Sequence, residues 1–501
     1  MVIRRAAAVV TLAALLAGGC GSGPLWARWR AERDLWRADR ATHAIAGDPH
    51  AAPAELAGAA ARYRKVSEHW PADVWVPRAV DDSLAADVAR VSGRAAIRSA
   101  SLAWRAGNAA DAAISFDAIE RAYAAVWPIA LEAGLAHAAA AELGGDSTLA
   151  FAVRRHVARG YPPVGPDGSL AKGVLDCARA VAEAERRAGH DAAADSAWRA
   201  FAAGLEAALA SGPAVDARPA LWLALAQARA GTGAAGRAAA RAALDQVLRD
   251  PHATDLVGHA RLELAELALA DGDFARAVTL ARRARLALPW DRGLDAVVVE
   301  ASAWERAGQR DSALTTYGRA VDEHWAPDRQ LTRARAERAR LFEEGGRWEE
   351  ARGELHALIA GDPLSDWALQ SMRRLVVHPL QRHELELAQL ELAWCIERLD
   401  RTLATVLDPG VLLATRRTKA DLLLTVGSDH RAIEALEDLW QHHPDTPDGV
   451  WAAFKAAELA EQQLNDRTTA ERLYREVATR APAGGDRREA ENRRRRLAGG
   501  G

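Results

Sequence analysis

The sequence has 501 residues, of which 50% are hydrophobic. Its 65 basic and 68 acidic residues give a net charge of -3 and a pI of about 6.6. The chain therefore lacks the global basic field that drives nucleic-acid binding, and we expect no nucleic-acid partner. Ala- and Leu-rich segments, with Glu and Arg between them and Gly and Pro at intervals, predict helix almost throughout.

The first expected element is a short apolar segment behind two basic residues. Arg4 and Arg5 precede a charge-free run from Ala6 to Ala17. As a helix this run spans about 18 Å, which is less than the hydrocarbon core of about 30 Å. The pattern predicts a secretory signal over residues 1–19 and not a membrane-spanning anchor.

The signal segment ends in LAGGC, residues 16–20, followed by Gly21, Ser22 and Gly23. LAGGC resembles the lipobox of bacterial lipoproteins. The resemblance implies that the thiol of Cys20 is acylated and that Cys20 becomes the mature N-terminus in the cell envelope. Because Gly21 is not aspartate, it also implies the outer membrane, facing the periplasm. The alternative is an ordinary signal peptide with an incidental cysteine.

Residues 20–50 are expected to contain a tether and a first helix rich in Trp and Arg. Three tryptophans and four arginines alternate there: Trp26, Arg28, Trp29, Arg30, Arg33, Trp36 and Arg37. We expect this helix to be the first of the fold, with its Trp stripe packed on the next helix pair. The alternative is a helix at a membrane interface, where Trp and Arg are both favoured.

A repeated spacing covers residues 51–485. In DGDFARAVTLARRARLALP, residues 271–289, Gly272 is followed by Ala277, Ala281 and Pro289 at five, nine and seventeen residues. The spacing recurs, in full or in part, after Gly107, Gly145, Gly189, Gly308, Gly346, Gly427 and Asn465. Glycine or asparagine ends one helix in the left-handed conformation, and a small alanine lets the next helix approach closely.

The alanines at the fifth position set the number of units. They are Ala59, Ala112, Ala150, Ala194, Ala239, Ala277, Ala313, Ala351, Ala432 and Ala470. The step from Ala351 to Ala432 is about twice the usual one, so we expect it to hold two units, one of them degenerate. Self-similarity at this period predicts a solenoid of about eleven helix pairs.

The set of small residue, Gly, aromatic residue (Phe274, Trp348), Ala, large residue and Pro resembles the tetratricopeptide repeat (TPR). The resemblance implies an all-α, right-handed α-solenoid of antiparallel helix pairs. The last two units are also similar to repeats in envelope lipoproteins. Cys177 and Cys395 are expected to be buried free thiols, since about five units separate them along such a solenoid. Residues 486–501, with Arg493 to Arg496, are expected to form a solvated capping helix; the alternative is a site for an anionic ligand.

Motifs that carry catalytic or metal chemistry are incomplete. Gly-Lys does not occur, so there is no phosphate loop, and no Gly-x-Ser-x-Gly or Cys-x-x-Cys motif appears. His383-Glu384 lacks the second histidine of a zinc helix, because Leu387 stands in its place. We therefore expect no enzyme activity, no cofactor and no metal.

The family resemblance also selects candidate binding residues. In TPR proteins the positions thirteen, ten and six residues before the turn glycine, on the first helix of each pair, face the concave side. The charged or polar residues at these positions are His259, Glu266, Asp295, Ser302, Arg333, Arg340, Arg417 and Asp421. Leu262, Val298 and Ala336 lie between them, and apolar residues among charges of both signs suit a protein or peptide partner.

The sequence thus predicts a scaffold, tethered to an envelope membrane by lipid, that binds protein or peptide partners through its concave surface. One alternative is an accessory factor in the assembly of the outer membrane or of exported polymers. Another is the superhelical domain of a peptidoglycan-acting enzyme without its catalytic module.

Overall fold

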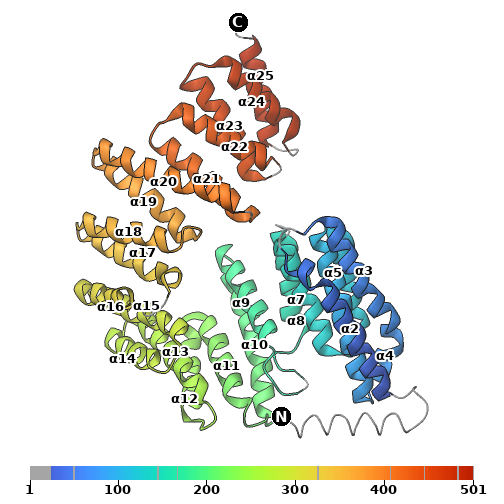
Figure 1. Ribbon diagram of the computed structural model, residues 1–501. Helices are drawn as coiled ribbons and strands as arrows, with labels where there is room; N and C mark the ends of the chain where they lie inside the picture. Colours follow the sequence, from blue (N-terminus) through green and yellow to red (C-terminus); the bar gives the residue numbers. More distant parts are fainter. Residues whose placement is uncertain are drawn as a thin grey trace, which may run out of the picture. The chain divides into compact units, whose positions relative to one another are not determined.

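The computed structural model describes residues 24–48, 51–143, 146–165, 167–323, 327–406, 408–444, 446–481 and 485–499. The chain divides into two compact units, Met1–Glu263 and Leu264–Gly501. Each unit is built from helices joined by short turns (Figure 1). In the described ranges the single β pairing is an isolated bridge between Val164 and Leu170. Among those same residues, none of the helices is both long and apolar enough to cross a bilayer.

The first unit contains five complete helix pairs and one short extra helix, α4. Its helices are α2 (Pro24–Gly47), α3 (Pro53–His69), α4 (Ala72–Arg78), α5 (Ser83–Arg105), α6 (Ala109–Ala122), α7 (Trp127–Leu143), α8 (Ser147–Gly160), α9 (Lys172–Arg187), α10 (Asp191–Ala210), α11 (Arg218–Gly231), η1 (Gly233–Gly236), α12 (Arg237–Arg249) and η2 (Thr254–Leu256). We call α2, α5, α7, α9 and α11 the A helices, and the second member of each pair the B helix.

The division between the units falls within α13 (Val257–Ala270). The helices that follow are α14 (Phe274–Arg285), α15 (Trp290–Arg306), α16 (Arg310–Asp322), α17 (Asp328–Glu344), α18 (Trp348–Gly361), α19 (Asp366–Gln381), α20 (Leu385–Thr405), α21 (Pro409–Thr425), α22 (Asp429–His442), α23 (Pro447–Gln462), α24 (Arg467–Arg480) and α25 (Gly485–Gly499). The odd-numbered helices α13 to α23 are A helices. With eleven A–B pairs in chain order, the prediction of an all-α solenoid of antiparallel, TPR-like helix pairs is confirmed.

The turns between A and B helices lie where the spacing places them. Positive φ values occur at Gly107, Gly189, Gly272, Gly308, Gly346, Gly427 and Asn465. Gly272, with φ of 81°, shows the reason: an L side chain is strained in this conformation, whereas glycine adopts it freely and ends the A helix. Gly145 lies outside the described residues.

One predicted alanine has the wrong register. The fifth-position alanines are buried, each at most 2% exposed, except Ala239, which is exposed. In that helix pair the short helix η1 precedes α12. The buried face of α12 is shifted by one residue, so that Ala240 and Leu244 pack inward and are both fully buried.

The long step after Ala351 contains a regular pair, α19 and α20. Its turn residue is His383, which has a positive φ of 61° although it is not glycine. Ala388 and Leu392 follow at the fifth and ninth positions and are buried at 0% and 4% exposure. This helix pair therefore keeps the turn and the buried fifth and ninth positions, but it lacks the glycine and also the proline of the spacing, since residue 400 is Asp.

We predict that A277L and A351L each lower the free energy of unfolding by about 1–3 kcal/mol, because both methyl groups are fully buried in close helix contacts. Urea denaturation of each variant measures the change. A239L is the matched control: its side chain points to solvent, so its midpoint should stay at the wild-type value. Equal effects in all three variants would contradict the register described here.

The two cysteines are as expected, and a last helix, α25, follows the final pair. Cys177 and Cys395 are free and buried, and burial raises their pKa to about 11 and about 12 respectively. In α25, Ala490 is fully buried, and the four consecutive arginines pair with glutamates of α23 or of α25 itself. The run Arg493 to Arg496 lies on α25, and its charges are paired within α23 and α25.

The expected packing of the Trp stripe on the next helix pair is wrong for two of its residues. Helix α2 packs through Ala31, Ala38 and Thr42, while Trp29 and Trp36 are 43% and 56% exposed. Small residues let α2 approach α3 and α5 closely, and the bulky indoles are left on the opposite side.

Candidate binding surface

We call the side of each unit formed by its A helices the A face. In the second unit, contacts run from α15 to α17, from α17 to α19 and from α19 to α21. Because B helices cover the opposite side of each A helix, side chains on the A face are the ones a bound segment meets along the row. The predicted binding residues lie on these helices, but they do not form one cluster.

Two of the eight predicted residues are exposed, and the other six are half-buried. Glu266 and Arg333 are exposed. Asp295 pairs with Arg292 at 3.2 Å, and Ser302 hydrogen-bonds Tyr317. His259 is half-buried in the first unit, so it does not belong to the same unit as the other seven. Of the expected apolar neighbours, Leu262 and Ala336 are buried in the core and Val298 is half-buried.

Arg340 holds two neighbouring A helices together. Its guanidinium pairs with Glu305 of α15 at 2.7 Å and with Glu337 and Glu344 of its own helix at 2.9 and 2.6 Å. The hydrogen bond to Glu305 is the main cause that raises the pKa of Arg340. With three carboxylates around it, Arg340 stabilises the A face and has little capacity left for a partner.

Arg417 plays the same role between α21 and α23. It pairs with Asp448 of α23 at 2.8 Å and with Asp421 at 3.3 Å. Its guanidinium also lies over the ring of Trp451, 3.3 Å from the ring centroid. The predicted residues Arg417 and Asp421 are thus joined to each other and to the next A helix.

A hollow of about 400 Å3 that the repeat spacing does not predict lies between α17 and α19. Its lining residues are Glu343, Gln370, Arg373, Arg374, Val377, His378 and Gln381. The signal that would have found it is His383 as a turn residue, because the positions thirteen, ten and six before it are Gln370, Arg373 and Val377. Because a histidine replaces the usual glycine, the repeated spacing did not reveal this helix pair.

The charges of this hollow are unevenly paired. Arg374 pairs with Glu343 of α17 at 2.9 Å. Arg373 is exposed, and no described carboxylate forms an ion pair with it. His378 stacks on Trp348 with ring centroids 3.7 Å apart and an angle of 7°, and burial lowers its pKa, so its ring is neutral near pH 7. The hollow therefore presents one available cation beside the neutral His378 ring, two glutamines and the paired Arg374 and Glu343, which suits an acidic or amide side chain.

In the first unit, hydrogen bonds connect three A helices in series. Arg179 of α9 donates to Gln227 of α11 at 3.0 Å, and Gln227 donates to Glu263 of α13 at 2.8 Å. These polar groups satisfy one another, and the series fixes the spacing of the A helices.

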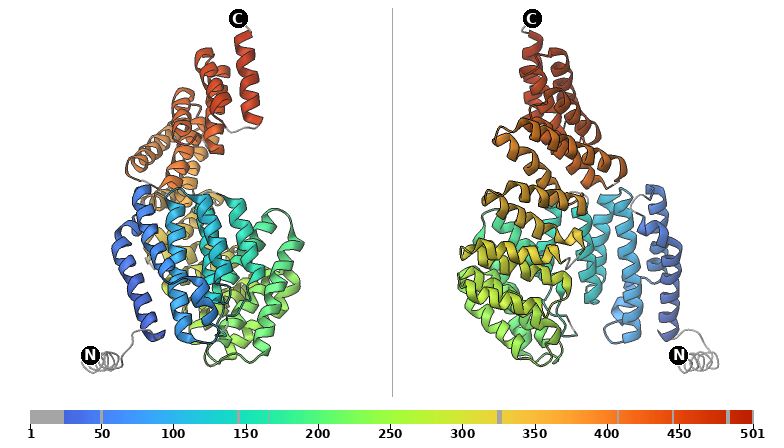
Figure 2. Two further views of the ribbon diagram at one scale, coloured as in Figure 1. Left: turned by 90° about the vertical axis from the view of Figure 1, so that its right-hand side faces the viewer. Right: turned by 60° about the vertical axis from the view of Figure 1, so that its left-hand side comes forward.

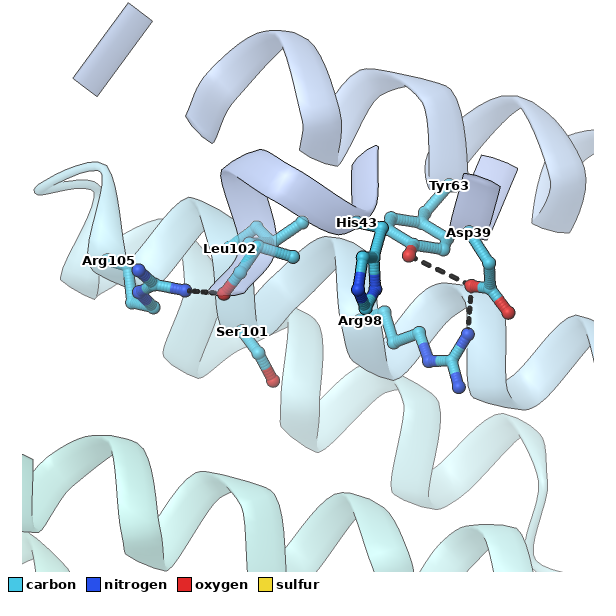
Figure 3. A pocket seen from close by; sticks show the side chains of 8 residues that line it. Asp39, His43, Tyr63, Arg98, Ser101, Leu102 and Arg105 are labelled. Carbon is cyan, nitrogen blue, oxygen red and sulfur yellow. Dashed lines mark hydrogen bonds and ion pairs between the residues drawn. The ribbon is translucent and has the colours of Figure 1, made fainter. Parts of the chain in front are cut away.

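A second hollow of about 400 Å3 lies between α2, α3 and α5. Asp39 accepts a hydrogen bond from Tyr63 at 2.9 Å and pairs with Arg98 (Figure 3). Arg105 donates to the carbonyl oxygens of Ala46 and Asp48, both at 2.7 Å. The charged groups here are engaged in attaching α2 to α5, so the hollow between α17 and α19 is the better candidate for a partner.

Metal or cofactor chemistry receives no support from the described side chains. Within the described ranges, no three His, Cys, Asp or Glu residues gather where they could hold a metal ion. The buried carboxylate of Glu391 is 1% exposed and binds Arg352 and His356 at 2.6 and 3.0 Å. Burial would raise the pKa of Glu391, but the hydrogen bonds from His356 and Arg352 outweigh burial and lower it. This cluster joins α18 to α20.

No protein-family model matches this chain, and neither does any curated protein. Among solved structures, yeast Tom70 is similar at 14% identity over 94% of this chain and 93% of its own, with a TM-score of 0.35. A tetratricopeptide repeat protein from Parabacteroides merdae is 14% identical over 56% of this chain and 99% of its own, with a TM-score of 0.28. RapI is 9% identical over 81% of this chain and 98% of its own, with a TM-score of 0.33. All three scores are below 0.5, so the fold assignment depends on the helix pairs and turns of this chain.

Proposed function

We propose that this protein is a binding scaffold without catalytic activity that holds an extended protein segment against its A face. The observation that carries the proposal is the unpaired Arg373 in the hollow between α17 and α19, with exposed Arg333 on the adjacent A helix. Arg340 and Arg417 of the same face are already paired with carboxylates of neighbouring A helices, whereas no ion pair to a described residue involves Arg333 or Arg373. A segment that carries acidic side chains complements them.

The proposal also includes attachment to an envelope membrane. The resemblance of LAGGC to a lipobox supports a lipid on Cys20, which lies outside the described residues. An acyl chain together with a second contact would keep the scaffold on the membrane, because one chain alone binds reversibly.

Site-specific photo-crosslinking in cells tests the proposed surface. A photoreactive phenylalanine analogue is placed at Arg333 or Arg373, and in a control at Gly353, an exposed B-helix position of α18 with open space around it. We expect defined protein adducts from the two A-face positions and none from the control. The same adducts from all three positions would contradict a specific A-face site.

We predict that R333E/R373E, which carries no crosslinker, recovers severalfold less of the client in a pull-down than the wild-type protein does, the client being the one identified by crosslinking. The reason is that two available cations become anions at exposed positions. Circular dichroism should be unchanged, since no described carboxylate is paired with either arginine. R340E should instead destabilise the fold, because it places a fourth carboxylate among Glu305, Glu337 and Glu344. Unchanged recovery with R333E/R373E, together with loss after changes at Arg493 to Arg496 or at Trp26 to Trp36, would assign binding to the ends of the solenoid.

A further inference from the structure

The N-terminal helix α2 has an unpartnered aromatic face. Leu25, Trp29 and Trp36 are 45%, 43% and 56% exposed. Trp26 stacks on Trp29 with ring centroids 4.9 Å apart. In the first unit α2 contacts α3 and α5, and in both views of Figure 2 this darkest blue helix lies at the edge of that unit.

The three indoles share one side of α2 because of helical spacing. Trp26 and Trp29 are three residues apart, and Trp36 follows after two further turns, so the three rings fall on one face. The opposite face holds Ala31, Ala38 and Thr42, and the hydroxyl of Thr42 lies 2.9 Å from that of Tyr63 of α3. The rotation of α2 is therefore fixed by its packing, and the indoles point away from the unit.

Guanidinium groups lie over all three indole rings. Their carbons are 5.4 Å from the Trp26 centroid, 5.0 Å from Trp29 and 5.4 Å from Trp36, and they belong to Arg30, Arg33 and Arg40 respectively. We name Trp26, Trp29, Arg33, Trp36 and Arg40 the α2 stripe.

The acidic residues of α2 already form ion pairs or hydrogen bonds with residues of this chain. Glu32 pairs with Arg28 at 2.9 Å. Asp34 pairs with Arg33 and accepts a hydrogen bond from the Trp70 indole, and Asp39 is engaged with Tyr63 and Arg98. Arg30, Arg37 and Arg40 are exposed and make no ion pair with a described residue. The stripe and its borders thus combine apolar rings with available positive charge.

We infer that the α2 stripe lies in the headgroup region of an anionic bilayer. Tryptophan prefers this region because one part of its ring system is apolar and its N–H is polar, and arginine is attracted to anionic lipids. The inference rests on the proposed attachment at Cys20 only for the presence of a nearby membrane, since Cys20 stands four residues before α2 begins.

A fluorescent probe on the stripe tests this inference in the full chain. The variant C20S/W36C is labelled with the environment-sensitive dye NBD at residue 36; Cys177 and Cys395 are buried and remain unlabelled. We expect the emission to brighten and shift to the blue with phosphatidylglycerol/phosphatidylethanolamine vesicles, and to change little with phosphatidylcholine vesicles. C20S removes the acylation site, so the result does not depend on lipid attachment.

Charge variants separate the effect of the arginines that border the α2 stripe from the effect of net charge. R30E/R37E should weaken binding to the anionic vesicles about tenfold or more, because each arginine near such a surface contributes about 1 kcal/mol. R276E/R283E is the matched control, with the same spacing on exposed positions of α14; its binding should stay within about twofold of the parent.

Three outcomes would overturn the inference. The first is co-sedimentation with vesicles without any spectral change at residue 36, which would mean that another part of the chain binds them. The second is a blue-shifted emission before vesicles are added, which would mean that this chain or a second copy covers the stripe. The third is equal loss of binding in R30E/R37E and R276E/R283E. The A-face crosslinks have a separate readout, so failure of either proposal is distinguishable from failure of the other.

Discussion

W440A is expected to lower the free energy of unfolding of the second unit by about 3–5 kcal/mol, the usual range for removing a buried Trp. Trp440 of α22 is 1% exposed and is among the largest fully buried side chains of the described residues. Its indole N–H donates to Glu476 of α24 at 3.0 Å, and Arg480 of α24 lies 4.9 Å over the ring. The substitution therefore leaves a cavity and also removes a contact between two consecutive B helices.

Urea denaturation and amide hydrogen exchange would measure this effect. Because each pair in a solenoid contacts mainly its neighbours, the loss of protection should be greatest in α21 to α24. W36A is the matched control: the same chemical change at an exposed ring should alter stability by no more than about 0.5 kcal/mol. Equal destabilisation by W440A and W36A would mean that Trp440 is not a core residue.

C20S is expected to abolish fatty-acid labelling completely, because the proposal gives the chain a single attachment point. Metabolic labelling with a clickable fatty acid, followed by detection of the purified protein, measures this. C177S and C395S are controls that should keep the label, since both thiols are buried and burial raises their pKa.

Fractionation of the same cells adds a second readout. If the α2 stripe binds anionic lipid, C20S protein that remains with membranes should be released by high salt, because electrostatic attraction to lipid is screened. Equal labelling of C20S and wild-type protein would contradict the proposed lipid attachment, whatever the stripe does.

The success of the repeat spacing has a local cause. Gly272, Gly346 and Asn465 have positive φ, as their place before an alanine-containing helix predicts. The conformation of one turn and the size of one methyl group depend on residues close in sequence, so a pattern reveals them. Ala239 was misplaced because η1 inserts residues that no spacing rule contains.

The binding surface was only partly predictable for a different reason. Counting back from a turn residue locates a position on a helix, and it selected Arg333 and Arg340 equally. The structure distinguishes the two residues, because the guanidinium of Arg340 forms ion pairs with three glutamates whereas Arg333 is exposed. Arg373 was missed because His383 occupies the turn that defines its register.

The sequence by itself determined the helical repeat, the turns and the buried alanines, because each is set by the conformational preference or size of residues within one helix pair. Only the tertiary structure decided which side of α2 packs inward. Both its alanine face and its tryptophan face follow helical spacing, and the close approach of α3 and α5 selects the alanines. The tertiary structure likewise decided which arginines have partners, since an ion pair such as Arg340–Glu305 joins residues that meet only when neighbouring A helices pack.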